Sequence, residues 1–169
     1  MGEMRQMLVK LGSGERHVFR GTFVRPGFKS YGQHYAPTLL LRDIYTATDQ
    51  LVTDHLWFNY TLGFLRLGTL SAGDEVQFAA RVASYRKGYV TQRTVDYKLA
   101  RPTQIQCLTA APRKALPLDN RHALIGYIML VNQAFYQANG RPFEAYYVTA
   151  FRQWQTQQTG TKRETLRPD

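Results

Sequence analysis

Residues 73–83 read GDEVQFAARVA, and the spacing of apolar residues in this stretch decides the fold. The pair Gly73-Asp74 is typical of a turn. After it, apolar residues recur at every second position, with polar or small residues between them: Val76, Phe78, Ala80 and Val82. A period of two is typical of a β-strand that turns one face to a hydrophobic core. We therefore predict a strand here and a β-rich region around it.

Four further segments between residues 17 and 108 have the composition of strands, because they are rich in Val, Leu, Phe, Tyr and Thr and bounded by Gly, Pro and Asp. They are residues 17–25, 38–45, 51–60 and 95–99, the last of which resumes at Ile105 after Pro102. Gly21 lies inside the first segment and predicts a bulge or sharp bend. Residues 61–67 suit a helical turn between the third and fourth strands.

The hydrophobic period changes near residue 110. Prolines at positions 112 and 117 indicate a linker, and Asp119 or Asn120 can cap a helix that ends near residue 140. A second helix, opened by Pro142, keeps its apolar spacing as far as Trp154. The chain beyond Trp154 is polar, and we expect residues 160–169 to fray. The C-terminal part therefore predicts a helical hairpin with a flexible tail.

The order of these elements resembles that of OB-fold proteins that bind single-stranded nucleic acid, over residues 16–108. The match is architectural, without a shared diagnostic motif. It implies a mainly β fold with C-terminal helices: a five-stranded OB-type β-barrel over residues 1–110 and a helical hairpin extension over residues 111–169. Residues 53–89 are also similar to small proteins of Gram-positive bacteria and their mobile elements, a likeness that implies no activity.

The composition favours a polyanionic ligand. Lys and Arg number 22 against 12 Asp and Glu, which gives a formal net charge of +10 and a pI near 9.9. Such a balance indicates nucleic acid or, less often, an anionic membrane surface. The lone Cys107 excludes an intramolecular disulfide and fits a reducing compartment. Since no signal peptide or membrane-spanning run is evident, we expect a cytoplasmic protein that does not enter a membrane.

Two loops are candidate ligand sites, because in OB-folds ligand meets strands two and three and the loops joining strands one to two and four to five. The first loop, residues 26–37, reads PGFKSYGQHYAP, and the second, residues 85–94, reads YRKGYVTQRT. Both combine aromatic rings with cations and contain no acidic residue. Rings of this kind stack on unpaired bases, and cations replace phosphate counterions.

The candidate binding residues fall into two groups. Aromatic side chains that could stack on bases are Phe28, Tyr31, Tyr35, Trp57, Tyr85 and Tyr89. Basic side chains that could contact phosphates are Arg25, Lys29, Arg86, Lys87 and Arg93. Trp57 alternates away from the apolar Leu56 and Phe58, so it either offers a stacking surface or is covered by the helical hairpin.

The sequence offers no support for an enzyme, a metal site or a cofactor. The four histidines are scattered, and neither a metal-ligand spacing nor a phosphate-binding loop is present. Asp54 and His55 are neighbours on a predicted strand, where their side chains should point to opposite faces. We therefore expect a protein without catalytic, metal or cofactor sites.

The leading hypothesis is non-enzymatic binding of single-stranded DNA or RNA through the two loops. The alternative is a protein-interaction or assembly module, in which the aromatic hairpin over residues 124–154 contacts a second copy or another protein. A third hypothesis is that the protein is a component of a larger enzyme, in which it binds the nucleic acid and another chain supplies catalysis. The sequence leaves open the choice between DNA and RNA.

Overall fold

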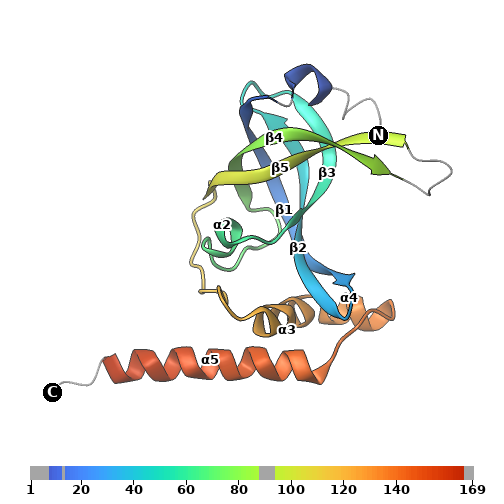
Figure 1. Cartoon of the computed structure of the whole chain (residues 1–169). Helices are drawn as coiled ribbons and strands as arrows, with labels where there is room; N and C mark the ends of the chain where they lie inside the picture. Colours follow the sequence, from blue (N-terminus) through green and yellow to red (C-terminus); the bar gives the residue numbers. More distant parts are fainter. Residues whose placement is uncertain (1–7, 13, 88–93, 166–169) are drawn as a thin grey trace.

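The computed structural model describes residues 8–12, 14–87 and 94–165 and is mainly β, with helices at the C-terminal end (Figure 1). The strands are β1 (Arg16–Tyr31), β2 (His34–Thr46), β3 (Leu51–Asn59), β4 (Glu75–Lys87) and β5 (Thr94–Cys107). The helices are α2 (Leu62–Leu65), α3 (Arg121–Val131), α4 (Gln133–Ala138) and α5 (Ala145–Thr165). The predicted helical turn between the third and fourth strands is confirmed as α2.

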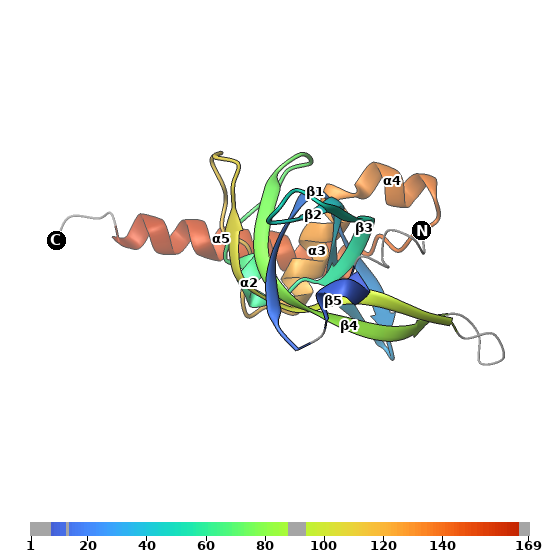
Figure 2. The same ribbon diagram turned by 90° about the horizontal axis from the view of Figure 1, so that it is seen from above.

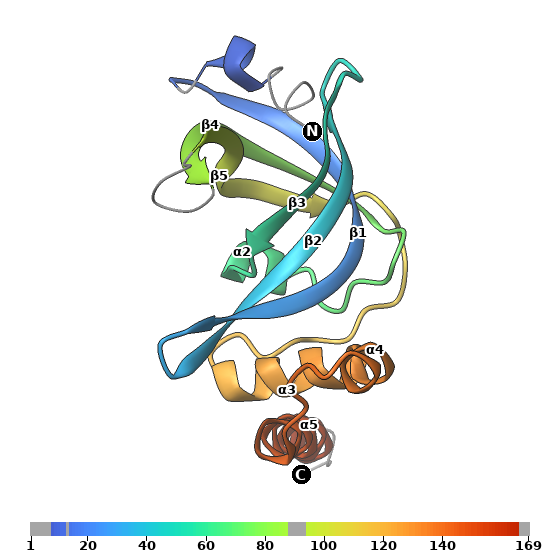
Figure 3. The same ribbon diagram turned by 90° about the vertical axis from the view of Figure 1, so that its right-hand side faces the viewer.

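The five strands form one antiparallel sheet in the order β3-β2-β1-β4-β5. The sheet is strongly curved, and α2 lies on its inner side (Figure 3). Within the described residues, β3 and β5 are the two edges, so the sheet is open. The mainly β class and the C-terminal helices are therefore confirmed, whereas closure of the sheet into a barrel is not.

The hydrophobic core lies on the inner side of this curved sheet. The predicted inward face of β4 is confirmed, since its four alternating apolar residues are all buried: Val76, Phe78, Ala80 and Val82. Phe19 of β1 lies 6.0 Å from Phe78, and Phe58 of β3 lies 5.3 Å from it, both between ring centroids. Phe64 of α2 completes this aromatic cluster. The alternation of apolar residues along β4 thus directs their side chains into the core.

The predicted loop at residues 26–37 is wrong, because this stretch is a β-hairpin that ends in a short turn at Gly32-Gln33. The pairing of β1 with β2 continues from Pro26 opposite Leu39 to Tyr31 opposite His34. β4 pairs with β1 only as far as Thr22, so the second half of β1 has one unpaired edge among the described strands. Proline is tolerated on such an edge, which is why Pro26 does not end the strand.

Two strands carry irregularities at the residues that the sequence singled out. The pairing of β1 with β2 shifts register at Gly21, which confirms the predicted bend. β5 runs without interruption past Pro102, although the sequence predicted a break there. Arg101 and Gln104 adopt positive φ angles of 52° and 51° beside register shifts in the pairing with β4, and these irregularities accommodate the proline.

The predicted helical hairpin is present with different boundaries. Asn120 caps α3 as predicted, since its side-chain oxygen accepts a hydrogen bond from Ala123 N at 3.0 Å. The first predicted helix divides at Asn132 into α3 and α4, and the Asn132 side-chain amide donates to the carbonyl of Pro26 at 2.9 Å. The sequence predicted a frayed tail from residue 160, and α5 is assigned as far as Thr165.

α3 forms a layer between the sheet and α5 (Figure 3). Seen from above, α5 extends past the sheet on one side (Figure 2). The two helices approach closely at Gly126, where an added Cβ would lie 2.0 Å from the carbonyl oxygen of Tyr147. Glycine is therefore required at this crossing.

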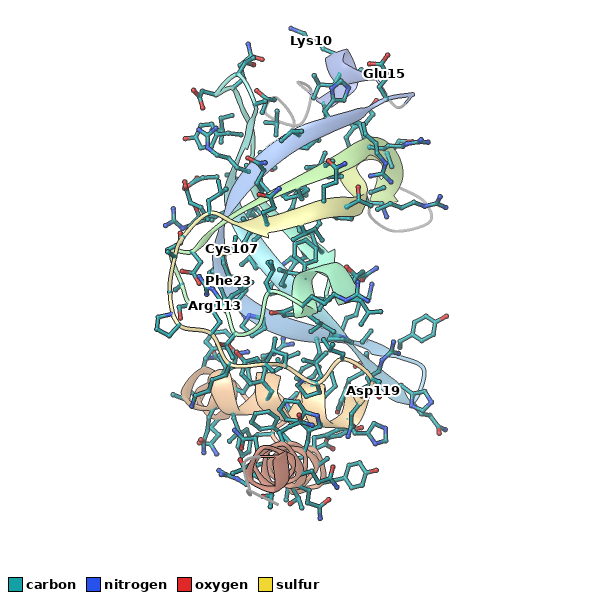
Figure 4. The ribbon with its side chains drawn as sticks, turned by 90° about the vertical axis from the view of Figure 1, so that its left-hand side faces the viewer. Lys10, Glu15, Phe23, Cys107, Arg113 and Asp119 are labelled. Atoms are coloured by element: carbon teal, nitrogen blue, oxygen red, sulfur yellow. The ribbon has the colours of Figure 1, made fainter. Side chains whose placement is uncertain are left out.

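A buried ion pair joins the start of β4 to the linker that leads into the helices. Arg113 donates to Asp74 at 2.6 Å, and their side chains are 13% and 8% exposed. Arg113 also donates to the carbonyls of Thr69 and Thr109, and it lies beside Cys107 (Figure 4). The hydrogen bond from Arg113 holds the pKa of Asp74 below its usual value. This pair fixes the path of the chain between the sheet and α3.

In the part of the chain that the structure describes, no helix combines the length and the apolarity needed to cross a membrane.

Candidate nucleic-acid interface

A pocket of about 310 Å³, here termed the Trp57 pocket, lies where the β1–β2 hairpin meets β3 and α4. The side chains used below are contributed by β1, β3, α4 and the segment that follows α4. They belong to Arg25, Lys29, Trp57, Tyr136 and Arg141. The described residues that line this pocket include three cations and no acid. The pocket therefore combines positive charge with aromatic surface.

The pairing register of the sheet brings the β1 and β3 residues together. Arg25 pairs with Leu40 across β1 and β2, and Leu40 pairs with Trp57 across β2 and β3. Residues directly opposite each other in an antiparallel sheet share a face, so Arg25 and Trp57 emerge on the same side. Gly27 lies against the ring, since a Cβ there would be 3.0 Å from a carbon of Trp57. The absence of a side chain at Gly27 lets the indole lie close to the strand.

Arg25 is held by aromatic rings. Its guanidinium carbon lies 5.2 Å from the ring centroid of Trp57 and 4.8 Å from that of Phe135. Cation–π contacts of this kind fall within the favourable range of about 6 Å. On the other side of the pocket, the Arg141 guanidinium lies 5.1 Å from the Tyr136 ring. Contacts with aromatic rings thus position the guanidinium groups of both Arg25 and Arg141.

This arrangement differs from that of two other arginines on the sheet, Arg20 and Arg42. Arg20 pairs with Asp49, and Arg42 donates to Asp43 at 2.6 Å. By contrast, Arg25, Lys29 and Arg141 form no ion pair with any acid among the residues that the structure describes. Their charge is therefore available to an external anion.

Four of the predicted binding residues line the Trp57 pocket: Arg25, Phe28, Lys29 and Trp57. Trp57 is 45% exposed, so α4 lies beside the indole without covering it. Phe28, which was predicted to stack on bases, presents little surface to the pocket, because its side chain is only 6% exposed. Its ring packs edge-on against Tyr136 at a centroid distance of 5.5 Å. Phe28 is therefore a core residue that packs against Tyr136, another residue of the pocket lining.

Tyr31 and Tyr35, also predicted to stack, belong to a second pocket of about 290 Å³, here termed the Tyr35 pocket. Tyr31 lies at the hairpin tip and is 75% exposed, whereas Tyr35 is half-buried. Burial and the neighbouring carboxylate of Glu144 raise the pKa of Tyr35. Residues 26–37, which the sequence predicted to be the first ligand loop, thus contribute to both pockets.

The second predicted loop, residues 85–94, lies largely outside the described part of the structure. The backbone of residues 85–87 continues β4 and pairs with residues 94–96 of β5, but the side chains of Tyr85, Arg86 and Lys87 are outside the described part of the structure. Tyr89 and Arg93 lie outside the described residues altogether. β4 runs toward the N-terminal end of β1, away from the β1–β2 turn. The structure therefore separates the end of β4 from the Trp57 pocket.

The sequence analysis missed Phe135, Tyr136 and Arg141 as parts of this interface. Tyr136 is fully buried, whereas Phe135 is exposed. A signal was available in the charge pattern, since residues 120–143 contain no acid. Arg141 follows Gly140, whose φ of 64° ends α4 and turns the chain back toward the hairpin.

Among the described residues, no group of three or more His, Cys, Asp or Glu side chains could hold a metal ion. Asp54 and His55, expected on opposite faces, are instead in contact, with Asp54 Oδ1 2.9 Å from His55 Nδ1. Both belong to the edge strand β3, and neither lines the Trp57 pocket.

The chain matches no protein-family model, no curated protein and no solved structure. The interface is therefore interpreted from its own geometry and chemistry.

Proposed function

We propose that the protein binds single-stranded nucleic acid at the Trp57 pocket without chemically changing it. The observation that carries this proposal is the convergence of Arg25, Lys29 and Arg141 around the exposed ring of Trp57, in a lining without acid. An unpaired base would stack on the indole, and such stacking contributes about 1 to 3 kcal/mol per base. The three cations would replace counterions of the flanking phosphates.

A preference for single strands over duplex follows from the stacking contact. A base within a duplex has both faces covered by its neighbours, whereas an unpaired base can lie flat on an aromatic ring. The contacts to phosphate alone would not distinguish the two. We therefore assign the preference for single strands to Trp57 and the larger share of the salt dependence to the cations.

The proposed fold is an OB-type barrel that remains partly open between β3 and β5. Support comes from the five antiparallel strands and from α2, which lies between β3 and β4 in the chain. OB-folds are partly open five-stranded barrels that bind oligonucleotides on the face of strands two and three. The Trp57 pocket includes residues of β2 and β3, in agreement with this assignment.

The direct test is fluorescence anisotropy with labelled twelve-nucleotide dT, rU and duplex DNA probes over a salt series. We expect the single strands to bind more tightly, with a log–log salt slope of about −2 or steeper for three or more phosphate contacts. Trp57→Ala should reduce the preference for single strands, and Lys29→Glu should weaken binding to all probes. Equal binding of duplex and single strands by the wild-type protein would overturn the proposal.

Arg66→Glu is the matched control for the charge reversal. Arg66 is exposed and lies after α2, outside the Trp57 pocket, so this variant changes the net charge as much as Lys29→Glu does. If the two reversals weaken binding equally, the interaction depends on total charge and the pocket is not the site.

A second candidate function is assembly through the C-terminal helices. A groove of about 640 Å³ lies between the linker, α3 and α5, and its apolar walls include Tyr127, Leu130, Val131 and Trp154. Val131 is an exposed aliphatic side chain there. Exposed apolar surface of this kind is typical of interaction sites.

A further inference from the structure

The Tyr35 pocket has the chemistry of a nucleotide site. Its floor is apolar, since Ile125 is buried and the rings of Tyr35 and Tyr147 lie 5.5 Å apart between centroids. Its rim carries Arg121 and His122 from the start of α3. The described lining contains no acid, and Glu144 lies beside Tyr35 without lining the pocket. A planar, apolar group with an attached anion would fit such a site.

The Trp57 and Tyr35 pockets lie at the two ends of one row of packed rings. Tyr136 and Arg141 line the Trp57 pocket, and Tyr136 contacts Phe28 at 5.5 Å between centroids. Phe28 contacts Tyr35 at 4.6 Å, and Tyr35 lines the second pocket. The row is largely buried between the hairpin and the helices, so the spacing between the pockets is fixed by packing.

The outer rim of the hairpin connects the same two pockets. Lys29 lines the Trp57 pocket and Tyr31 lines the Tyr35 pocket. Both are exposed and belong to β1, two positions apart. Side chains at i and i+2 of a strand point to the same face, with their Cα atoms about 6 to 7 Å apart. A single extended strand of nucleic acid could therefore pass from one pocket to the other along this rim.

We propose that the Tyr35 pocket is a second nucleotide subsite, which accepts a neighbouring nucleotide of the strand held at the Trp57 pocket. This inference rests on the proposed function and extends its footprint across the hairpin tip. The base lies on Tyr35 and Tyr147, and Arg121 contacts a phosphate. Tyr31 closes the pocket from the hairpin tip. Because the strand must bend over the hairpin, a duplex cannot occupy both subsites.

The test compares Arg121→Glu and Tyr31→Ala with the wild-type protein, using the labelled dT twelve-mer. For Arg121→Glu, loss of one phosphate contact to a single strand should reduce the affinity about fivefold at 0.1 M salt and make the log–log slope shallower by about 0.7. Tyr31→Ala should weaken binding without this change of slope, because it removes a ring and no charge. Both side chains are exposed, so the variants should retain the wild-type circular dichroism spectrum and Tm. Arg66→Glu again serves as the charge-matched control.

A second measurement locates the strand directly. Photocrosslinking of a 4-thiothymidine oligonucleotide, followed by peptide mass spectrometry, should identify adducts on the peptide that contains Tyr31 and Tyr35 as well as on the one that contains Trp57. Adducts at Trp57 alone, with wild-type affinity for Arg121→Glu, would overturn the second subsite and leave the proposed function intact. Absence of binding by the wild-type protein would instead overturn both.

Discussion

Gly27 shows how a single residue can shape a binding pocket. Because an added Cβ would lie 3.0 Å from the indole, another residue would require the Trp57 ring to move by a few tenths of an ångström. The Arg25 guanidinium lies over the same indole. Glycine at this position therefore stabilises the arrangement of the two side chains that we expect to contact nucleic acid. The sequence indicated Gly27 only as part of the predicted loop over residues 26–37.

The Asp74–Arg113 pair predicts a pH-dependent contribution to stability. Asp74→Asn leaves the buried guanidinium without its counterion, so we expect the free energy of unfolding at pH 7 to fall by about 3 kcal/mol. Since Arg113 lowers the folded-state pKa of Asp74, the carboxylate contributes stability above its unfolded pKa of about 3.9. That contribution is lost as the pH falls through the lower, folded-state pKa. Urea denaturation from pH 7 down to pH 2 measures both effects.

Asp49→Asn is the control for this prediction. Asp49 pairs with Arg20 at the surface, and its side chain is 74% exposed. Exposed ion pairs contribute at most about 1 kcal/mol, so this variant should unfold nearly as the wild type does. If the two substitutions cost the same free energy, the buried pair does not hold the linker as we describe.

At the scale of elements, the helical layer depends on the close crossing of α3 and α5. Alanine is favoured over glycine by about 1 kcal/mol within an isolated helix. We nevertheless expect Gly126→Ala to destabilise the protein by about 1 to 3 kcal/mol, because its Cβ would overlap the backbone of Tyr147. Hydrogen exchange should show that Gly126→Ala accelerates amide exchange in α5, relative to the wild type, more than it does in the strands. Gly14→Ala adds the same methyl group in open space and should change neither quantity.

Elements with a strict period were predicted best from the sequence. The alternation in β4 and the Asn120 cap each depend on a local pattern, and both are confirmed. The β1–β2 hairpin was missed because a local rule, that Pro26 interrupts a strand, ignores whether a neighbouring strand needs its missing N–H. The extent of α5 was missed for a similar reason, since its polar end has no apolar period to mark it.

At the scale of the molecule, the candidate interface could be predicted only in part. The sequence indicated Arg25, Lys29 and Trp57, which the sheet register then brings together. It could not show that Arg141, more than a hundred residues after Arg25, returns to the same pocket. That placement depends on the packing of α4 against the hairpin, a tertiary contact without a local signature.

The assembly hypothesis also belongs to this scale. If the groove beside Val131 and Trp154 joins two copies, multi-angle light scattering should give twice the monomer mass of 19.5 kDa. Val131→Glu would place a charge in that interface and should restore the monomer. Ala134→Glu on the exposed side of α4 is the control and should leave the mass unchanged. A wild-type monomer at high concentration would remove this alternative.

The central position of β1 in the sheet has a consequence for synthesis of the chain. β1 leaves the ribosome before the other four strands of this sheet, and its partner β2 follows directly. Its other partner, β4, is made only after β3 and α2. The pairing of β1 with β4, which includes Arg16 opposite Arg81, therefore forms late. During that interval the nascent sheet exposes an unpaired strand edge on which other chains can assemble. Translation speed and chaperone access over residues 47–87 should therefore govern the yield of folded protein.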